Sequence, residues 1–163
     1  MAKQLVVYYS RKGENHMPGG IQVLEKGNTE YAAEYIAKAI GADLFEIDTV
    51  KPYAANYREC CMEAVQEVKT KARPEITGFV EDISGYDTIF VCFPCWCGTA
   101  PMCVFTFLEH YNWTGKKIIP LCTNEGSGLC LRTLARGKHR ILRCAGSKRL
   151  YFGRVPGCGL YHL

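Results

Sequence analysis

Two short polar segments near the N-terminus could together bind an anion. An apolar run ends in Ser-Arg-Lys at residues 10–12, and a helical pattern begins at residues 27–30, Gly-Asn-Thr-Glu. A helix N-terminus offers free backbone N–H groups and the positive end of the helix dipole, so it attracts phosphate. Asparagine and threonine are also ordinary helix-capping residues. The candidate ligands of a phosphate monoester at this point are Ser10, Lys12, Asn28 and Thr29.

Two further loops have a matching character. Residues 94–99 follow the apolar run 89–93, and residues 123–128 follow the run 117–122. Both loops are rich in glycine, hydroxyl or amide residues, and Trp96 adds one large aromatic ring. In open α/β sheets, ligands bind outside the carboxyl ends of the strands, so we expect the loops to line one crevice. A planar aromatic ring on a phosphorylated tail would suit such a crevice.

The order of elements predicts how these loops come together. Strands that alternate with helices form a doubly wound parallel sheet through right-handed crossovers. Residues 11–26 do not fit this alternation, and their polar composition indicates a surface excursion. On the first helix, the apolar positions at helical spacing are Ala32, Tyr35, Ile36, Ala39 and Ile40. We expect strands at 3–9, 42–49, 87–94 and 117–123, and helices at 29–40, 57–72 and 101–111.

Length and composition indicate one domain. The 163 residues are enough to bury a core, and no apolar run is long enough to span a membrane. The chain begins directly with a strand pattern and no signal-peptide pattern, so a cytoplasmic protein is expected. Several of the ten cysteines lie in apolar runs, and most would remain thiols in a reducing compartment. Cys92, Cys95 and Cys97 lack a second ligand pair at suitable spacing, so no metal is predicted.

Charge divides the chain into two parts. Residues 1–128 carry 12 lysines and arginines against 16 acids, a net charge of −4. Residues 129–163 carry 8 lysines and arginines and no acid, a net charge of +8. The basic composition is therefore a property of the C-terminal segment and does not mark the whole chain as a nucleic-acid-binding protein.

Residues 3–128 resemble the flavodoxins, specifically a bacterial flavodoxin-like subfamily. The resemblance rests on the segments described above, taken in order: Ser-Arg-Lys-Gly-Glu-Asn, Gly-Asn-Thr-Glu, Pro-x-Trp-x-Gly-Thr-x-Pro and Asn-Glu-Gly-Ser-Gly. The family binds flavin mononucleotide (FMN) without a covalent bond and carries electrons. The resemblance therefore implies a flavodoxin-like α/β fold of three layers, FMN as cofactor, and a reductase and an acceptor protein as redox partners. No membrane or nucleic-acid partner is expected.

The same resemblance implies which residues hold the cofactor. Ser10, Lys12, Asn28 and Thr29 would bind the phosphate, and Trp96 would stack on the flavin ring with Gly98 near its N5 atom. Trp96 could instead pack only within its loop, and Glu125 could be a solvated loop acid. The remaining residues of the two flavin loops are Pro94, Cys95 and Cys97 in the first, and Thr123, Asn124, Glu125, Gly126 and Gly128 in the second.

The resemblance ends after residue 128. Residues 129–163 show neither a clear fifth strand nor a last helix, and they form an atypical basic segment of the same domain. A reading-frame shift near residue 130 is the favoured interpretation, and a divergent basic tail that docks an acidic partner is the alternative. Without a fifth strand, strand 117–123 would be an exposed edge.

Two other functions use features of this chain. An NAD(P)H-dependent quinone or flavin reductase shares the fold, but nothing in the sequence identifies a nicotinamide pocket. Nucleic-acid binding through the basic segment would show a strong dependence on salt. An electron carrier is the leading interpretation.

Overall fold

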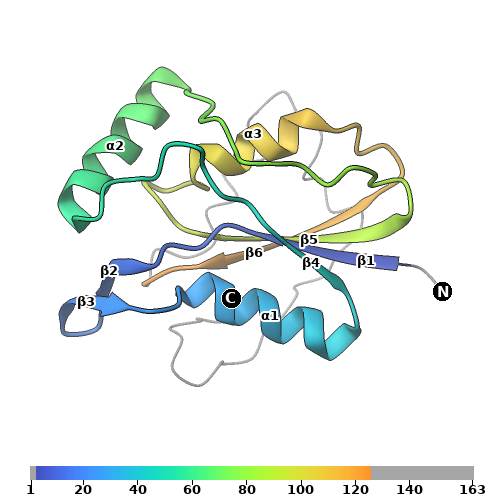
Figure 1. The fold of residues 1–163 in the computed structure, drawn as a ribbon, viewed down its shortest axis with the longest axis horizontal. Helices are drawn as coiled ribbons and strands as arrows, with labels where there is room; N and C mark the ends of the chain where they lie inside the picture. The colour runs from blue at the N-terminus through green and yellow to red at the C-terminus, as the bar shows by residue number, and fades with distance from the viewer. Residues whose placement is uncertain (1–2, 126–163) are drawn as a thin grey trace.

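The central feature of the computed structural model is a parallel four-stranded sheet. The structure describes residues 3–125, and its sheet has the order β4-β1-β5-β6 (Figure 1). Neighbouring strands are parallel in all three pairs, as in doubly wound α/β domains. The fold predicted from the sequence is therefore confirmed. The strands are β1 (Lys3–Tyr8), β4 (Asp43–Glu46), β5 (Tyr86–Pro94) and β6 (Lys117–Thr123).

Helices cover both faces of the sheet, which gives three layers (Figure 1). Helix α1 (Asn28–Ile40) lies on one face, and α2 (Tyr57–Thr70) and α3 (Met102–His110) lie on the other. Alternate residues of a strand point to opposite faces. On β5, Val91 and Phe93 accordingly pack in the core beneath α3, whereas Cys92 packs in the core beneath α1.

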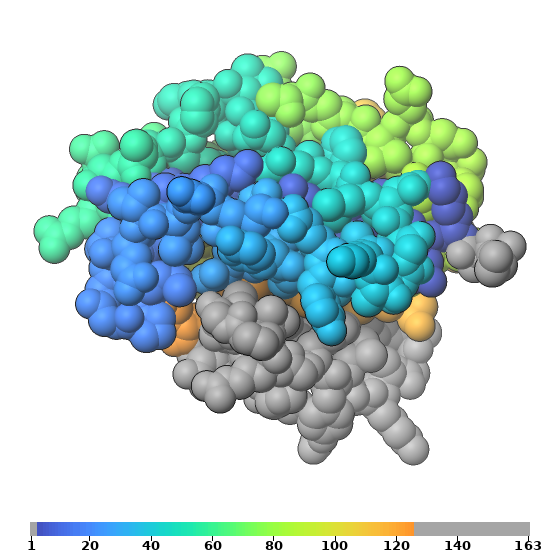
Figure 2. Space-filling model, turned by 60° about the horizontal axis from the view of Figure 1, so that its bottom comes forward, coloured from blue at the N-terminus to red at the C-terminus, as the bar shows by residue number. Residues whose placement is uncertain are grey.

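The segment predicted as a polar excursion is a β-hairpin. β2 (Gly13–Met17) and β3 (Gly20–Leu24) pair antiparallel and form a second, two-stranded sheet. Pro18 and Gly19 make the turn, and Gly19 has φ +98°, which favours glycine. Figure 2 shows the hairpin, in blue, at one end of the described surface and next to α2. The strands escaped prediction because their mixed polar pattern lacks a buried face.

Helix α1 lies where it was predicted, but only Ala32 and Ile36 of the predicted apolar face are buried. Ala32, Ala33, Ile36 and Ala37 are buried, whereas Tyr35 is 66% exposed and Ile40 is 38% exposed. Three of these four buried residues are alanines, and they pack in one core cluster with Val6 and Tyr8 of β1. Gly41 ends the helix with a left-handed backbone.

Other boundaries differ by a few residues from the prediction. β4 covers only Asp43–Glu46, although Ile47 continues it with a hydrogen bond from its N–H to the carbonyl of Tyr8 (2.7 Å). Helix α2 ends at Thr70, because Lys71 adopts a left-handed backbone before Pro74 is reached. β6 spans the predicted residues and, within 3–125, pairs only with β5. The predictions for residues 129–163 lie outside the described residues, as do Gly126 and Gly128.

None of the helices in the described part of the chain is both long and apolar enough to cross a membrane.

Candidate functional site

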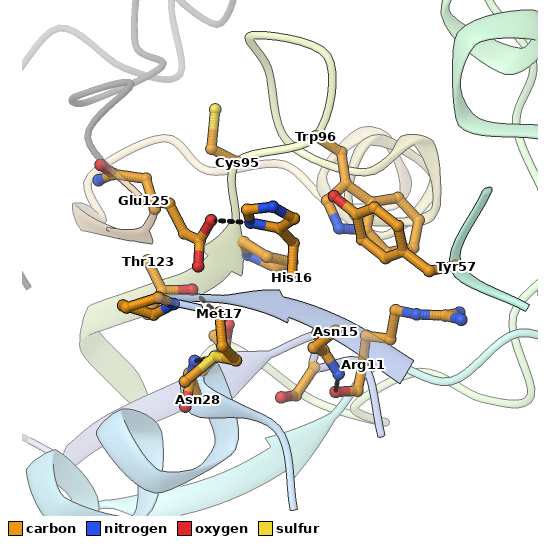
Figure 3. A pocket seen from close by; sticks show the side chains of 15 residues that line it. Arg11, Asn15, His16, Met17, Asn28, Tyr57, Cys95, Trp96, Thr123 and Glu125 are labelled. Carbon is orange, nitrogen blue, oxygen red and sulfur yellow. Dashed lines mark hydrogen bonds and ion pairs between the residues drawn. The ribbon is translucent and has the colours of Figure 1, made fainter. Parts of the chain in front are cut away.

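A cavity of about 410 Å³ lies at the carboxyl ends of β1, β5 and β6 (Figure 3). Binding sites for small molecules have volumes in this range. Trp96 and Tyr57 lie on one side of the cavity, and Asn28, Met17 and Thr123 lie on another. The lining residues come from six segments of the chain: Ser10, Arg11, Asn15, His16, Met17, Pro18, Asn28, Thr29, Tyr57, Pro94, Cys95, Trp96, Thr123, Asn124 and Glu125.

The N-terminus of α1 forms one wall of this cavity. Its N-cap residue, Gly27, provides no side chain, and the hydroxyl of Ser10 accepts a hydrogen bond from the N–H of Glu30 (3.1 Å) instead. The end of β1 therefore caps α1 across a gap in sequence. Because Ser10 Oγ accepts from the helix, its O–H remains available to donate to a ligand.

Gly27 permits this close approach between α1 and the end of β1. A Cβ atom on Gly27 would lie 2.2 Å from Ser10 Oγ and 2.4 Å from the carbonyl oxygen of Arg11. The backbone of Gly27, with φ −74°, is open to any residue, so only packing requires glycine here. This constraint is invisible in the sequence.

A buried pair of hydroxyls joins α1 to β6. The Oγ1 atoms of Thr29 and Thr123 are 2.7 Å apart, and both side chains are buried. Nearby, the Asn28 amide donates to the sulfur of Met17 (3.3 Å), which ties α1 to the hairpin. All four residues line the cavity, so these contacts hold its wall together.

The two cationic side chains after β1, those of Arg11 and Lys12, interact with other groups of the protein. Arg11 is buried, and its guanidinium donates to the carbonyls of Glu14 (2.8 Å), Ala54 (3.0 Å) and Ala55 (2.8 Å). The Lys12 ammonium lies 3.8 Å from Glu30 and 3.7 Å from Glu46, and Lys12 does not line the cavity. The structure therefore does not bring Lys12 to the predicted phosphate position, because two acids attract its side chain elsewhere.

The loop after β5 forms a tight turn that exposes its tip. Trp96 and Thr99 exchange backbone hydrogen bonds of 2.8 and 2.9 Å, and the two residues between them have positive φ angles, 52° for Cys97 and 76° for Gly98. This is the backbone of a type I′ turn. Cys97 and Gly98 are exposed and do not line the cavity, whereas Pro94, Cys95 and Trp96 do.

Two tyrosines hold Trp96 in place. The ring of Tyr53 lies 5.0 Å from that of Trp96 at an interplanar angle of 84°, and the ring of Tyr9 lies 5.4 Å away at 83°. Such edge-to-face contacts are favourable arrangements of aromatic rings. Trp96 is thus packed by its neighbours and also lines the cavity, while its stacking on a flavin ring stays a prediction.

The hairpin contributes cavity residues that sequence analysis missed. Asn15, His16, Met17 and Pro18 all line the cavity, and Tyr57 joins them from the start of α2. His16 Nδ1 contacts the carboxylate of Glu125, so the hairpin reaches across to the segment after β6 (Figure 3). Glu125 is therefore paired and is more than a solvated loop acid. The motif Ser-Arg-Lys-Gly-Glu-Asn reaches only as far as Asn15, so no motif marked the rest of the hairpin as part of the site.

Most cysteines of the described residues are free thiols, as predicted. Cys95 is disulfide-bonded. Burial raises the pKa of Cys92 and of Cys103 to about 12, so both remain protonated at neutral pH and are poor nucleophiles. Cys97 is the exposed thiol next to the cavity. Residues 3–125 hold no group of three potential metal ligands.

One comparison with known proteins identifies a family. Residues 23–142 match the flavodoxin family. No curated protein matches the chain. The match begins inside the hairpin and extends past residue 128, the point where the motif resemblance ends.

Solved structures give the same result for the fold. A candidate flavoprotein from Bacteroides eggerthii is 29% identical, with a TM-score of 0.62 over 77% of this chain and 73% of its own. A candidate flavoprotein from Bacteroides uniformis is 28% identical, with a TM-score of 0.59 over 76% of this chain and 72% of its own. A flavoprotein from Lactobacillus acidophilus, solved in complex with FMN, is similar in fold at 20% identity, with a TM-score of 0.53 over 78% and 95% of the two chains.

Proposed function

We propose that this chain, which belongs to the flavodoxin family, binds FMN in the cavity at the carboxyl ends of β1, β5 and β6 and uses it to carry electrons. The observation that carries the proposal is the convergence of the α1 N-terminus and Trp96 on this one cavity. The fold match to a flavoprotein solved with FMN adds support.

The residues of the cavity fit the two ends of FMN. The α1 N-terminus, with the Ser10 hydroxyl and the Asn28 and Thr29 side chains, would hold the phosphate through neutral donors and the helix dipole. The cations of Arg11 and Lys12 are held by other groups, so phosphate recognition would not depend on a side-chain charge. Trp96 and Tyr57 are the aromatic residues that would contact the flavin ring.

When bound, FMN would accept and release the electrons. The protein would bind it, orient it and limit its access to water. The hairpin, fastened through His16 and Glu125, would form the outer wall of the site. The described part of the chain carries a net charge of −4, which disfavours added negative charge on the cofactor and so lowers its reduction potential.

Flavin binding can be tested by titrating purified protein with FMN and with riboflavin while the flavin fluorescence is recorded. We expect quenching by both, with FMN bound more tightly by roughly 10- to 100-fold because riboflavin lacks the charge-assisted hydrogen bonds of the phosphate. Equal affinities would contradict the phosphate site at α1, and an absence of quenching would contradict the proposal.

A pair of variants then locates the ring. Trp96→Ala should weaken FMN binding by roughly 2- to 10-fold, the contribution of one aromatic contact. Tyr35→Ala is a matched control, because Tyr35 is 66% exposed on α1 and does not line the cavity. Electron transfer is tested by photoreducing the bound FMN with EDTA as the electron donor and mixing the reduced protein with oxidised cytochrome c. If the reduced protein does not reduce cytochrome c under these conditions, the carrier role is refuted.

A further inference from the structure

A second cavity lies behind the wall of the first. Its volume is about 650 Å³, and it lies between α2 and the segments 50–53 and 72–75. Tyr53 and Glu67 both line it, while Trp96 lines the first cavity. No part of the proposed flavin site uses Glu67.

Tyr53 connects the two cavities. Its hydroxyl donates a hydrogen bond to Glu67 Oε2 (2.8 Å), and its ring packs edge-to-face against Trp96 at 5.0 Å. Tyr9 supports the same cluster, with its ring 6.0 Å from Tyr53 and 5.4 Å from Trp96. A shift of the Tyr53 ring would therefore remove one of the two aromatic contacts that hold Trp96.

The surroundings of Glu67 make its hydrogen bond sensitive to proton uptake. Burial raises the pKa of Glu67 above its ordinary value, and the neighbouring Glu63 adds to this effect, while Tyr53 and Lys51 oppose it. Burial also raises the pKa of Tyr53, so its phenol stays protonated and continues to donate. The thiol of Cys103 interacts with both Tyr53 and Glu67 and stays protonated as well.

The remaining charged residues that line the second cavity, Arg73 and Glu75, do not act on the Glu67 carboxyl. The Arg73 guanidinium forms a two-pronged ion pair with Glu109 at 2.6 Å. Glu75 also lines the cavity, and it is not among the neighbours that change the pKa of Glu67. Glu75 is therefore a suitable control position.

We infer that Glu67 is a positioning residue, which holds Tyr53 and, through Tyr53, Trp96. Proton uptake by Glu67 in the second cavity would thereby change the position of Trp96 in the wall of the proposed flavin site. The inference rests on the proposed function for its effect on FMN, but the placement of Trp96 does not depend on FMN. An ionised Glu67 accepts a stronger hydrogen bond from Tyr53 than a neutral one does.

Three variants separate charge, hydrogen bonding and packing. Glu67→Gln retains an acceptor oxygen without a charge, and Tyr53→Phe retains the ring without the hydroxyl. Glu67→Ala removes the acceptor. Glu75→Gln changes an acid of the same cavity that has no contact with Tyr53 in the structure.

The first measurement uses the protein without flavin. Trp96 emission is obtained by subtracting the spectrum of Trp96→Phe, which retains only the buried Trp113. In the unsubstituted chain and in Glu75→Gln, we expect Trp96 emission to titrate with a midpoint above 4.5, the ordinary value of a glutamate. Glu67→Gln should abolish this transition, and Tyr53→Phe should do the same. A transition that persists in both variants would overturn the inference.

The second measurement is FMN affinity across the same variants. Glu67→Ala and Tyr53→Phe should weaken binding by up to the contribution of one aromatic contact, roughly 2- to 10-fold. Glu67→Gln, which imitates the protonated acid, should weaken binding to a smaller extent, and Glu75→Gln should leave it unchanged. Unchanged affinity in all four variants would overturn the coupling to the flavin site. If no protein binds FMN while the Trp96 titration behaves as expected, the positioning role stands and the proposed function fails.

Discussion

Gly27→Ala should destabilise this protein although the backbone at this position accepts alanine. With φ −74° and ψ 152°, Gly27 has an extended conformation that any residue adopts. The added Cβ, however, would lie 2.2 Å from Ser10 Oγ and 2.4 Å from the Arg11 carbonyl oxygen. The second of these atoms belongs to the backbone, so α1 and the end of β1 must separate.

The magnitude follows from two costs. Overpacking at a close contact costs typically about 1–3 kcal/mol. Separation of α1 from β1 also breaks the cap that Ser10 provides to the N–H of Glu30, and loss of an N-cap costs about 1 kcal/mol. We therefore expect Gly27→Ala to lower the free energy of unfolding by about 2–4 kcal/mol.

Urea unfolding followed by far-ultraviolet circular dichroism measures this change. Gly78→Ala is the matched control, because a Cβ there meets no heavy atom within 4 Å and the residue has no positive φ. The control should be neutral, or more stable by up to about 1 kcal/mol. If the free energies of unfolding of Gly27→Ala and Gly78→Ala differ by less than about 0.5 kcal/mol, the close contact between α1 and β1 is not as described.

Three more predictions concern the site and its supports. Thr29→Val or Thr123→Val alone leaves one buried hydroxyl without its partner and should lower the free energy of unfolding by about 1–3 kcal/mol. The double variant should lower it by less than the sum of the two, and additive losses in a double-mutant cycle would contradict the pairing. Gly98→Ala should lower the free energy of unfolding by roughly 1–2 kcal/mol, because position 98 has a positive φ, whereas Cys97→Asn should leave it unchanged or raise it, because asparagine tolerates this conformation better. If Cys97→Asn unfolds at a lower temperature than Gly98→Ala, the turn geometry is refuted. Because burial raises the pKa of Glu67 above 4.5, the folded state keeps this proton at pH values where the unfolded state has released it. The free energy of unfolding should therefore fall, relative to Glu67→Gln, as the pH rises through 4.5 toward the folded pKa. A stability difference between the two proteins that stays constant between pH 4 and pH 7 would exclude this effect.

Strands with one consistent environment could be predicted well from the sequence. β6 has the predicted bounds, and β5 differs by one residue, because both are buried runs of apolar side chains. The hairpin could not be predicted, because its polar strands are stabilised by contacts with distant segments. One of them is the hydrogen bond that the Glu14 carboxylate accepts from the N–H of Tyr57 (2.6 Å). The exposed Tyr35 on α1 shows the same limit, since helical spacing alone does not say which apolar face meets the sheet.

The local pattern of residues was enough to determine a doubly wound α/β domain and to indicate that the loops after β1, β5 and β6 meet. Those properties depend on short-range periodicity and on the general handedness of crossover connections. Tertiary structure decided which side chains face the cavity. It turned Lys12 toward Glu30 and Glu46, brought His16 to Glu125, and required glycine at position 27. These outcomes depend on distances between segments far apart in the chain, and such distances exist only once the layers have packed.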